Sequence, residues 1–285
     1  MMNSDRFFKV SSIGLLGGWL ILFSLVPLFL LVIISFLTPG DDAFYQQPLT
    51  FTHYITLFHP IYLHIFARSL LLACTVTALC LLLGYPFAYF LATLQHHYKP
   101  LLLALMIIPF WTSSLIRTYA IVTLLKAQGP LNAVLLHLGL IDKPLQLLYT
   151  QTAVIIGMVY SLLPYMILPL YARIEKLDHQ LLDAAYDLGA SPLYTLMRIT
   201  IPLTMPGIIA GSILVFLPAM TLFYIPDILG GARAMLLGNL ISNQFMNANN
   251  WPFGSVLSIA LTALLLLMLV GLRLVQPKEK TRASV

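Results

Sequence analysis

Five residues between positions 216 and 227 have side chains that could bind a positively charged organic molecule. They recur at the helical spacing i, i+4, i+7, i+8 and i+11, and they are Phe216, Met220, Phe223, Tyr224 and Asp227. Aromatic faces attract ammonium groups, and a carboxylate supplies the counter-charge. The spacing predicts one continuous helix face that suits an organic cation. In the alternative interpretation, the aromatic side chains pack on a neighbouring helix and Asp227 lies in water at the helix end.

Three residues elsewhere are weaker candidates for the same pathway or for its support. Tyr160 lies four residues before Pro164, where a helix kink is expected. Trp111 fits a solute pathway and a membrane interface equally well. A charged Arg117 is costly in lipid and would repel a cation, so we expect it to have a structural role beside a carbonyl, an acid or water.

An amphipathic stretch, DAAYDLGASPLYTLMRITIPL at 183–203, lies between long apolar runs. Asp178 is suited to cap the start of a helix, and Gly189 to adopt the left-handed conformation at its end. Ser191 and Pro192 then restart a helix, which we expect Pro202 to end. The pattern predicts two short helices joined at a glycine and shaped to fit a groove in another protein. A connector without a partner is the plainer alternative.

The sequence lacks the motifs of enzyme active sites. It has no G-x-x-x-x-G-K-[ST] phosphate loop, no H-E-x-x-H and no G-x-S-x-G. The histidines His53, His59 and His64 do not have the spacing of a metal site. We therefore expect no catalytic residue, no metal site and no cofactor bound by this chain.

The elements that position these residues are membrane-spanning helices. The chain is 60% hydrophobic and only 9% charged, with a mean hydropathy of +0.92, which excludes a water-soluble domain. Its net charge of +5 is attributed to basic loops rather than to nucleic-acid binding. Prolines 27, 86, 109, 164, 169 and 218 are expected to kink the spans. Six apolar runs are long enough to cross a hydrocarbon core of ~30 Å, and they are 13–37, 67–94, 101–125, 150–172, 204–226 and 253–275.

The distribution of basic residues predicts the direction of the spans. Lys126, Lys143 and Arg233 occupy one set of loops. The termini and the other loops hold ten basic residues, which are Arg6, Lys9, Lys99, Arg173, Lys176, Arg198, Arg273, Lys278, Lys280 and Arg282. Because cytoplasmic loops are the more basic ones, both termini and the 183–203 stretch are expected in the cytoplasm.

The amphipathic stretch resembles the EAA loop of ABC importer permeases, whose pattern is E-A-A-x3-G-x9-I-x-L-P. Asp183 stands in place of the family's Glu, and Ile201 in place of its Leu. The resemblance implies an all-α, type I permease fold in a single domain, 1–285, with a cytoplasmic coupling loop at 173–203. It also implies that this loop docks on a separate ATP-hydrolysing subunit and transmits its closure through Asp183, Ala184, Ala185, Gly189, Ile199, Ile201 and Pro202.

Further segments are similar to the B-type permease subunit of bacterial spermidine/putrescine importers. They are PFWTSSLIRTYA (109–120), QGPLN (128–132), FYIPDILGG (223–231), LLGNLISNQF (236–245) and NWPFGSVLS (250–258). The resemblance implies a place in the bacterial inner membrane and a pathway for polyamines that works by alternating access. It implies as partners a C-type permease, two ATPase subunits that bind ATP and magnesium, and a periplasmic polyamine-binding protein.

Other functions remain as alternatives at this point. Related permeases move thiamine, iron or sulfate. A secondary transporter would need acids in the middle of its spans and usually repeated halves, and neither is visible. A membrane enzyme would need a catalytic constellation, and an assembly factor would move no solute.

Overall fold

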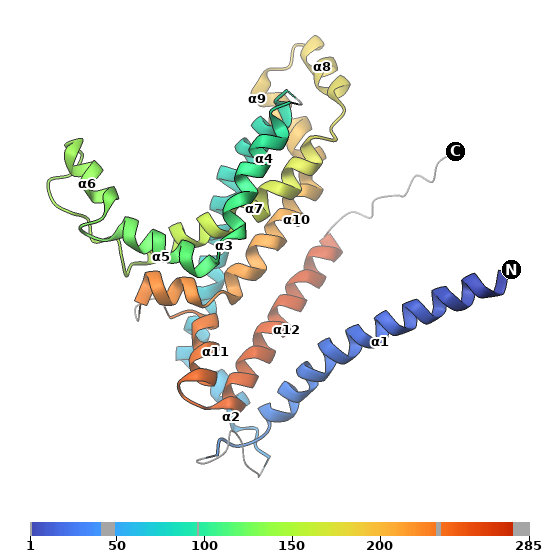
Figure 1. Ribbon diagram of the computed structural model, residues 1–285, viewed down its shortest axis with the longest axis vertical. Coiled ribbons are helices and arrows are strands. Elements are labelled where there is room, and N and C mark those ends of the chain that lie inside the picture. The colour runs from blue at the N-terminus through green and yellow to red at the C-terminus, as the bar shows by residue number, and fades with distance from the viewer. Residues whose placement is uncertain (1, 41–48, 96, 232–234, 276–285) are drawn as a thin grey trace. The chain divides into compact units, whose positions relative to one another are not determined.

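The computed structural model describes residues 2–40, 49–95, 97–231 and 235–275, and these are mostly helical (Figure 1). The described residues contain no β-strand. The predicted all-α fold with six membrane spans is confirmed. The segments long and apolar enough to cross a membrane are Ile13–Ser35, Pro60–Thr93, Ser114–His137, Gln151–Ile174, Pro192–Thr221 and Trp251–Gly271. The chain divides into two compact parts, which are described in turn.

The first part combines the residues up to Leu63 with those from Leu240 onward. Its helices are α1 (Met2–Ser35), α2 (Thr52–Leu57) and α12 (Trp251–Val275), and both α1 and α2 contact α12. The apolar side chains of α1 between residues 13 and 30 are mostly exposed. An apolar helix of this length is stable only where lipid or another chain covers it. The part is therefore built for a membrane.

The second part runs from His64 to Asn239 and holds the residues singled out above. It begins in α3 (Pro60–Thr93) and ends in α11 (Leu237–Met246). Between them lie α4 (Lys99–Ile107), η1 (Ile108–Trp111), α5 (Ser114–Leu125), α6 (Pro130–His137), α7 (Gln151–Ile174), α8 (His179–Asp187), α9 (Pro192–Thr195), η2 (Leu196–Thr200), α10 (Ile201–Thr221) and η3 (Pro226–Gly230).

The most extensive helix contact of this part is between α7 and α10, and two glycines make it possible. Gly207 and Gly211 are four residues apart on α10, the small-xxx-small spacing of closely packed membrane helices. A Cβ at Gly211 would lie 2.7 Å from the Met166 Sδ and 3.1 Å from the Met166 carbonyl oxygen. Met166 is fully buried. The backbones of the two helices can approach only because residue 211 has no side chain.

The third predicted span, 101–125, is wrong as a single helix. The chain forms α4, tightens into the 3₁₀ turn η1, and then takes an extended conformation at Thr112 and Ser113 before α5 begins. Pro109 lies in the tightened turn, where it has no N–H for a helical hydrogen bond. The apolar residues therefore divide between a short helix, Lys99–Trp111, and the candidate span Ser114–His137.

Candidate functional site

The predicted helix–glycine–helix stretch forms as expected. Asp178 caps α8, its side chain accepting the Gln180 N–H at 3.0 Å. Gly189 has φ +83°, and the Gly189 and Ala190 N–H groups donate to the carbonyls of Tyr186 and Ala185. This is the hydrogen-bond pattern that ends a helix at a left-handed glycine. The local signals for capping therefore predicted this turn correctly.

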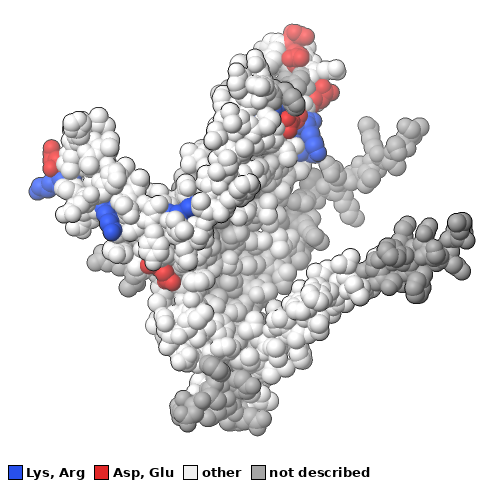
Figure 2. Space-filling model, viewed as in Figure 1, with Lys and Arg blue, Asp and Glu red and all other residues white. Residues whose placement is uncertain are grey.

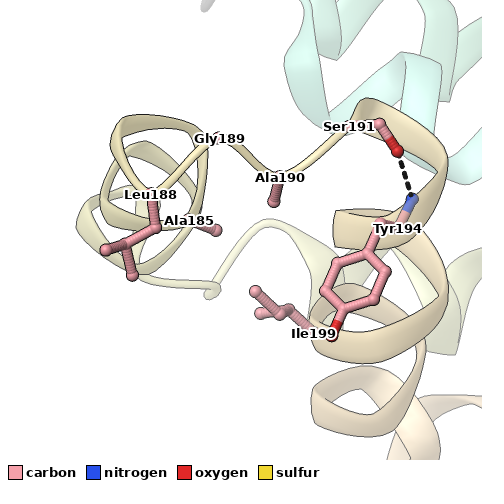
Figure 3. A pocket seen from close by; sticks show the side chains of 7 residues that line it. All are labelled: Ala185, Leu188, Gly189, Ala190, Ser191, Tyr194 and Ile199. Carbon is pink, nitrogen blue, oxygen red and sulfur yellow. Dashed lines mark hydrogen bonds between the residues drawn. The ribbon is translucent and has the colours of Figure 1, made fainter.

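The second short helix begins at Ser191, as predicted. The Ser191 Oγ accepts the Tyr194 N–H at 3.3 Å, and Pro192 occupies the first helical position. Between α8 and this helix lies a groove of about 540 Å³ (Figure 3), lined by Ala185, Leu188, Gly189, Ala190, Ser191, Tyr194 and Ile199. Its lining combines small residues with the larger side chains of Leu188, Tyr194 and Ile199.

Pro202 does not end the second helix, so that prediction is wrong. The chain passes from α9 through the π-helical turn η2 directly into α10, with Pro202 in the first turn of α10. The Ile201 N–H donates to the Leu196 carbonyl five residues earlier, so the turn is wider than an α-helical one. The wide turn accommodates a proline that would otherwise break the helix. A rigid connection from the loop to the span results.

The residues of the expected coupling motif differ in exposure. Ala185 is buried, while Asp183, Ala184, Gly189 and Pro202 are exposed. Ile199 and Ile201 are half-buried. Figure 2 shows acidic side chains gathered over α8, the helix that holds Asp183. Lys99 and Glu175 form an ion pair at 3.3 Å that joins the start of α4 to the end of α7. The loop therefore presents a charged and mostly exposed surface.

The predicted continuous face from Phe216 to Asp227 is wrong, because α10 ends at Thr221. Leu222 is extended, and the chain becomes helical again at Tyr224 and continues into η3 at Pro226. The break lies at Leu222, before Pro226, which occupies the first position of η3. Met220 is buried and Phe216 is half-buried in the helix, whereas Phe223 and Asp227 are exposed beyond its end.

The structure still brings together the aromatic and acidic residues beyond the helix end. The rings of Phe223 and Tyr224 stand at 89° with their centroids 6.1 Å apart, and Asp227 follows three residues later. Asn239 from α11 was not predicted from the sequence as part of this site. Its Nδ2 donates to the Phe223 carbonyl at 2.8 Å and to the Asp227 carboxylate. No local pattern marks Asn239, since its partners lie 12 and 16 residues earlier.

The remaining candidates lie apart from this cluster or have other contacts. No hydrogen bond or ring contact joins Trp111 or Tyr160 to Asp227 in the part of the chain that the structure describes. Trp111 is 85% exposed at the end of η1, and Tyr160 is exposed on α7. The guanidinium of Arg117 lies 4.5 Å from the ring centre of Phe110, a cation–π contact, and not beside the carbonyl or acid that was expected. Its Nε and Nη1 are buried without a hydrogen-bond partner among the described residues.

Among the described residues, no group of three or more His, Cys, Asp or Glu side chains could hold a metal ion.

Comparison with known proteins identifies the family. Residues 13–280 match the family described as binding-protein-dependent transport system inner membrane component. The chain belongs to this family. Its members are transport components rather than enzymes, and the chain is a multi-pass inner-membrane protein.

Several members of this family are similar to the chain over nearly its whole length. It is 53% identical over 253 residues to the spermidine/putrescine transport system permease protein PotB of Escherichia coli K12, covering 89% of this chain and 92% of that protein. The PotB proteins of Salmonella typhimurium SL1344 and Haemophilus influenzae are 50% and 48% identical over 270 and 266 residues. These matches cover 95% and 93% of this chain, and 94% and 93% of those proteins. The predicted resemblance to this group of permeases is confirmed.

Two solved structures show the same fold at low sequence identity. A chain of the bacterial alginate ABC transporter, in complex with its alginate-bound periplasmic protein, superposes with a TM-score of 0.73 over 94% of both chains at 18% identity. A second alginate importer structure gives a TM-score of 0.69 at 19% identity, covering 96% of this chain and all of that one. At these identities the likeness concerns the fold alone.

Proposed function

We propose that this chain is the permease subunit through which an ATP-driven importer carries polyamines, spermidine and putrescine, across the inner membrane. The observation that carries the proposal is the identity of about half of the residues to polyamine permeases over at least 89% of the chain. Such an importer needs a second permease, an ATPase pair holding ATP and magnesium, and a periplasmic protein that delivers the solute. The chain itself binds no cofactor in this proposal.

The loop at 173–203 is proposed to dock on the ATPase from the cytoplasmic side. Three observations support this role. Asp183 and Ala184 are exposed on α8, a glycine-ended turn fixes the angle to the next helix, and η2 connects that helix to α10 without a break. A rigid loop joined to a span can turn closure of a partner into helix movement. The ten basic residues of the termini and alternate loops support a cytoplasmic placement of both termini.

The segment beyond α10 is proposed as the place where the solute's ammonium groups meet the chain. An exposed carboxylate at Asp227 and the exposed ring of Phe223 are the two features that support it. Cations bind favourably to a carboxylate and to an aromatic face where little water competes. Tyr224 contributes a second ring, while buried Met220 is proposed to support the site from behind.

Uptake into vesicles tests the solute class. Uptake of labelled spermidine is measured in vesicles that hold the purified complex, with its binding protein present. Unlabelled putrescine, thiamine and sulfate serve as competitors. We expect putrescine to compete and thiamine and sulfate to have no effect. Competition by thiamine or sulfate, or stimulation of the ATPase only by another binding protein, would contradict the proposal that polyamines are the solute. The proposal that the chain is a permease would stand.

A further inference from the structure

We propose that Asn239 is a positioning residue that holds the Asp227 carboxylate for an ammonium group of the solute. The inference rests on the proposed function, since it assigns a role within the same site. It concerns a residue on α11, a helix that begins at Leu237, beyond η3.

The two N–H groups of one amide fix the geometry of the site. The Asn239 Nδ2 donates to the Phe223 carbonyl, which also accepts the Asp227 backbone N–H at 3.1 Å, and to the Asp227 Oδ1. Both partners are acceptors, so rotating the amide by 180° would bring oxygen against oxygen. The Asn239 side chain therefore links the Asp227 carboxylate to the backbone turn that follows the helix break.

The amide itself is held in place by its surroundings. Asn239 is only 6% exposed. The Leu237 N–H donates to the Ser69 Oγ at 2.8 Å, which attaches the start of α11 to α3. A Cβ at Gly238 would lie 2.6 Å from the Thr221 carbonyl oxygen, so the absence of a side chain lets α11 approach the end of α10. These contacts give Asn239 a rigid base from which to orient Asp227.

The carboxylate remains available to a solute. Asp227 is exposed, and within the described ranges no donor is found for its second oxygen. The Asn239 Oδ1 is buried and has no hydrogen-bond partner among the described residues. A buried oxygen without a partner is unfavourable, and an apolar side chain of similar size would avoid it. An amide at position 239 is explained if its N–H groups are needed to hold the Phe223 carbonyl and the Asp227 carboxylate.

A double-mutant cycle separates positioning from support of the fold. Uptake of labelled spermidine is measured against concentration for the complex with the unaltered chain, Asp227→Asn, Asn239→Leu and the double variant. We expect Asn239→Leu to raise the apparent KM roughly tenfold, the effect of losing a hydrogen bond to a charged group. The double variant should have the KM of Asp227→Asn alone. Asn243→Ala, which changes the same side chain one turn later on α11, is the control and should leave KM unchanged.

The outcomes distinguish this inference from the proposed function. If the unaltered complex takes up no polyamine, the proposed function fails, and the role of Asn239 in solute binding fails with it. If uptake is normal but the two substitutions raise KM independently, or Asn239→Leu lowers only the maximal rate, Asn239 supports the fold and the inference alone is overturned. Melting temperatures of the four proteins test the contact without any solute, and additive shifts would also overturn the inference.

Discussion

At the scale of single residues, the site depends on one exposed carboxylate next to aromatic rings. Asp227 stands three residues beyond Tyr224, and both follow the end of α10. The break at Leu222 precedes both residues, and the Asp227 N–H donates to the Phe223 carbonyl at 3.1 Å, so the carboxylate lies one helical turn beyond Phe223. Asp227 is exposed, so its negative charge is open to contact by an ammonium group.

Asp227→Asn should weaken polyamine uptake without reducing the amount of protein in the membrane. Loss of one charged contact is worth about 1.5–3 kcal/mol, which corresponds to a rise in apparent KM of roughly tenfold or more. The measurement is uptake of labelled spermidine against concentration, normalised to the protein amount. Asp142→Asn removes another exposed carboxylate and is the matched control. An unchanged KM for Asp227→Asn would exclude this residue from the solute site.

His53 should make the stability of the protein depend on pH. Burial lowers the pKa of His53 below its usual range, and a hydrogen bond with the Leu37 backbone offsets part of this shift. The unfolded chain therefore binds the proton first, and stability is lost as the pH falls below about 6.5. Melting temperatures at pH 7.5 and 5.5 should differ less for His53→Phe than for the unaltered protein. The difference is small, because His53 is only partly buried; equal differences in both proteins would contradict the prediction.

At the scale of helices, local signals predicted the coupling loop well and the broken spans poorly. The caps at Asp178 and Ser191 and the turn at Gly189 depend on residues within a few positions, and all three formed as predicted. The end of α10 depends on Asn239 and Gly238, which come from a distant segment. The helical spacing of the side chains continues through such a break. It therefore predicts a continuous helix at a position where tertiary contacts end the helix.

Gly189→Pro should uncouple ATP hydrolysis from uptake. Gly189 has φ +83°, whereas proline fixes φ near −65°, so the angle between α8 and α9 would change. Gly189→Asn is the matched control, because asparagine tolerates the left-handed conformation. ATP hydrolysis and spermidine uptake are measured on the same vesicles. Uptake per ATP hydrolysed should fall for the proline variant and stay unchanged for the asparagine variant.

Asp183→Lys provides a second test of docking that leaves the backbone unchanged. The substitution reverses the charge of an exposed side chain on α8 and should also lower uptake per ATP. If Gly189→Pro and Asp183→Lys both transport normally, the loop does not transmit ATPase closure.

Gly211→Val should destabilise the pair of α7 and α10. A Cβ there meets Met166 at 2.7 Å, and the branched side chain would force the helices apart at a cost of about 1–3 kcal/mol. Gly14→Val places the same side chain on α1, where a Cβ meets nothing within 4 Å. Thermal unfolding in detergent should show a lower melting temperature for Gly211→Val only. Equal melting temperatures would mean that the close contact does not contribute to stability.

At the scale of the whole molecule, the exposed apolar helices and the charged loops describe a chain that works inside a membrane and with partners. Large apolar side chains on α1, such as Trp19 and Phe23, are 62% and 58% exposed. The number of spans could be predicted from the sequence, because length and apolar composition decide it. The partners could not be derived from physical patterns, since an uncovered apolar surface does not identify what covers it.

The predicted topology places residue 183 in the cytoplasm and residue 142 outside. Single cysteines are introduced at these positions in a chain with Cys74→Ala and Cys80→Ala. A maleimide that cannot cross membranes should label Asp142→Cys in right-side-out vesicles and Asp183→Cys in inside-out vesicles. The reverse pattern would contradict the orientation that the basic residues indicate.

The most direct test of the central claim is accumulation of labelled spermidine in proteoliposomes that hold the whole complex. ATP is trapped on the ATPase side, and the binding protein is added on the other. The account predicts accumulation that requires ATP, the binding protein and an intact 183–203 loop together. Accumulation driven by an ion gradient without ATP would contradict it and show a secondary transporter instead.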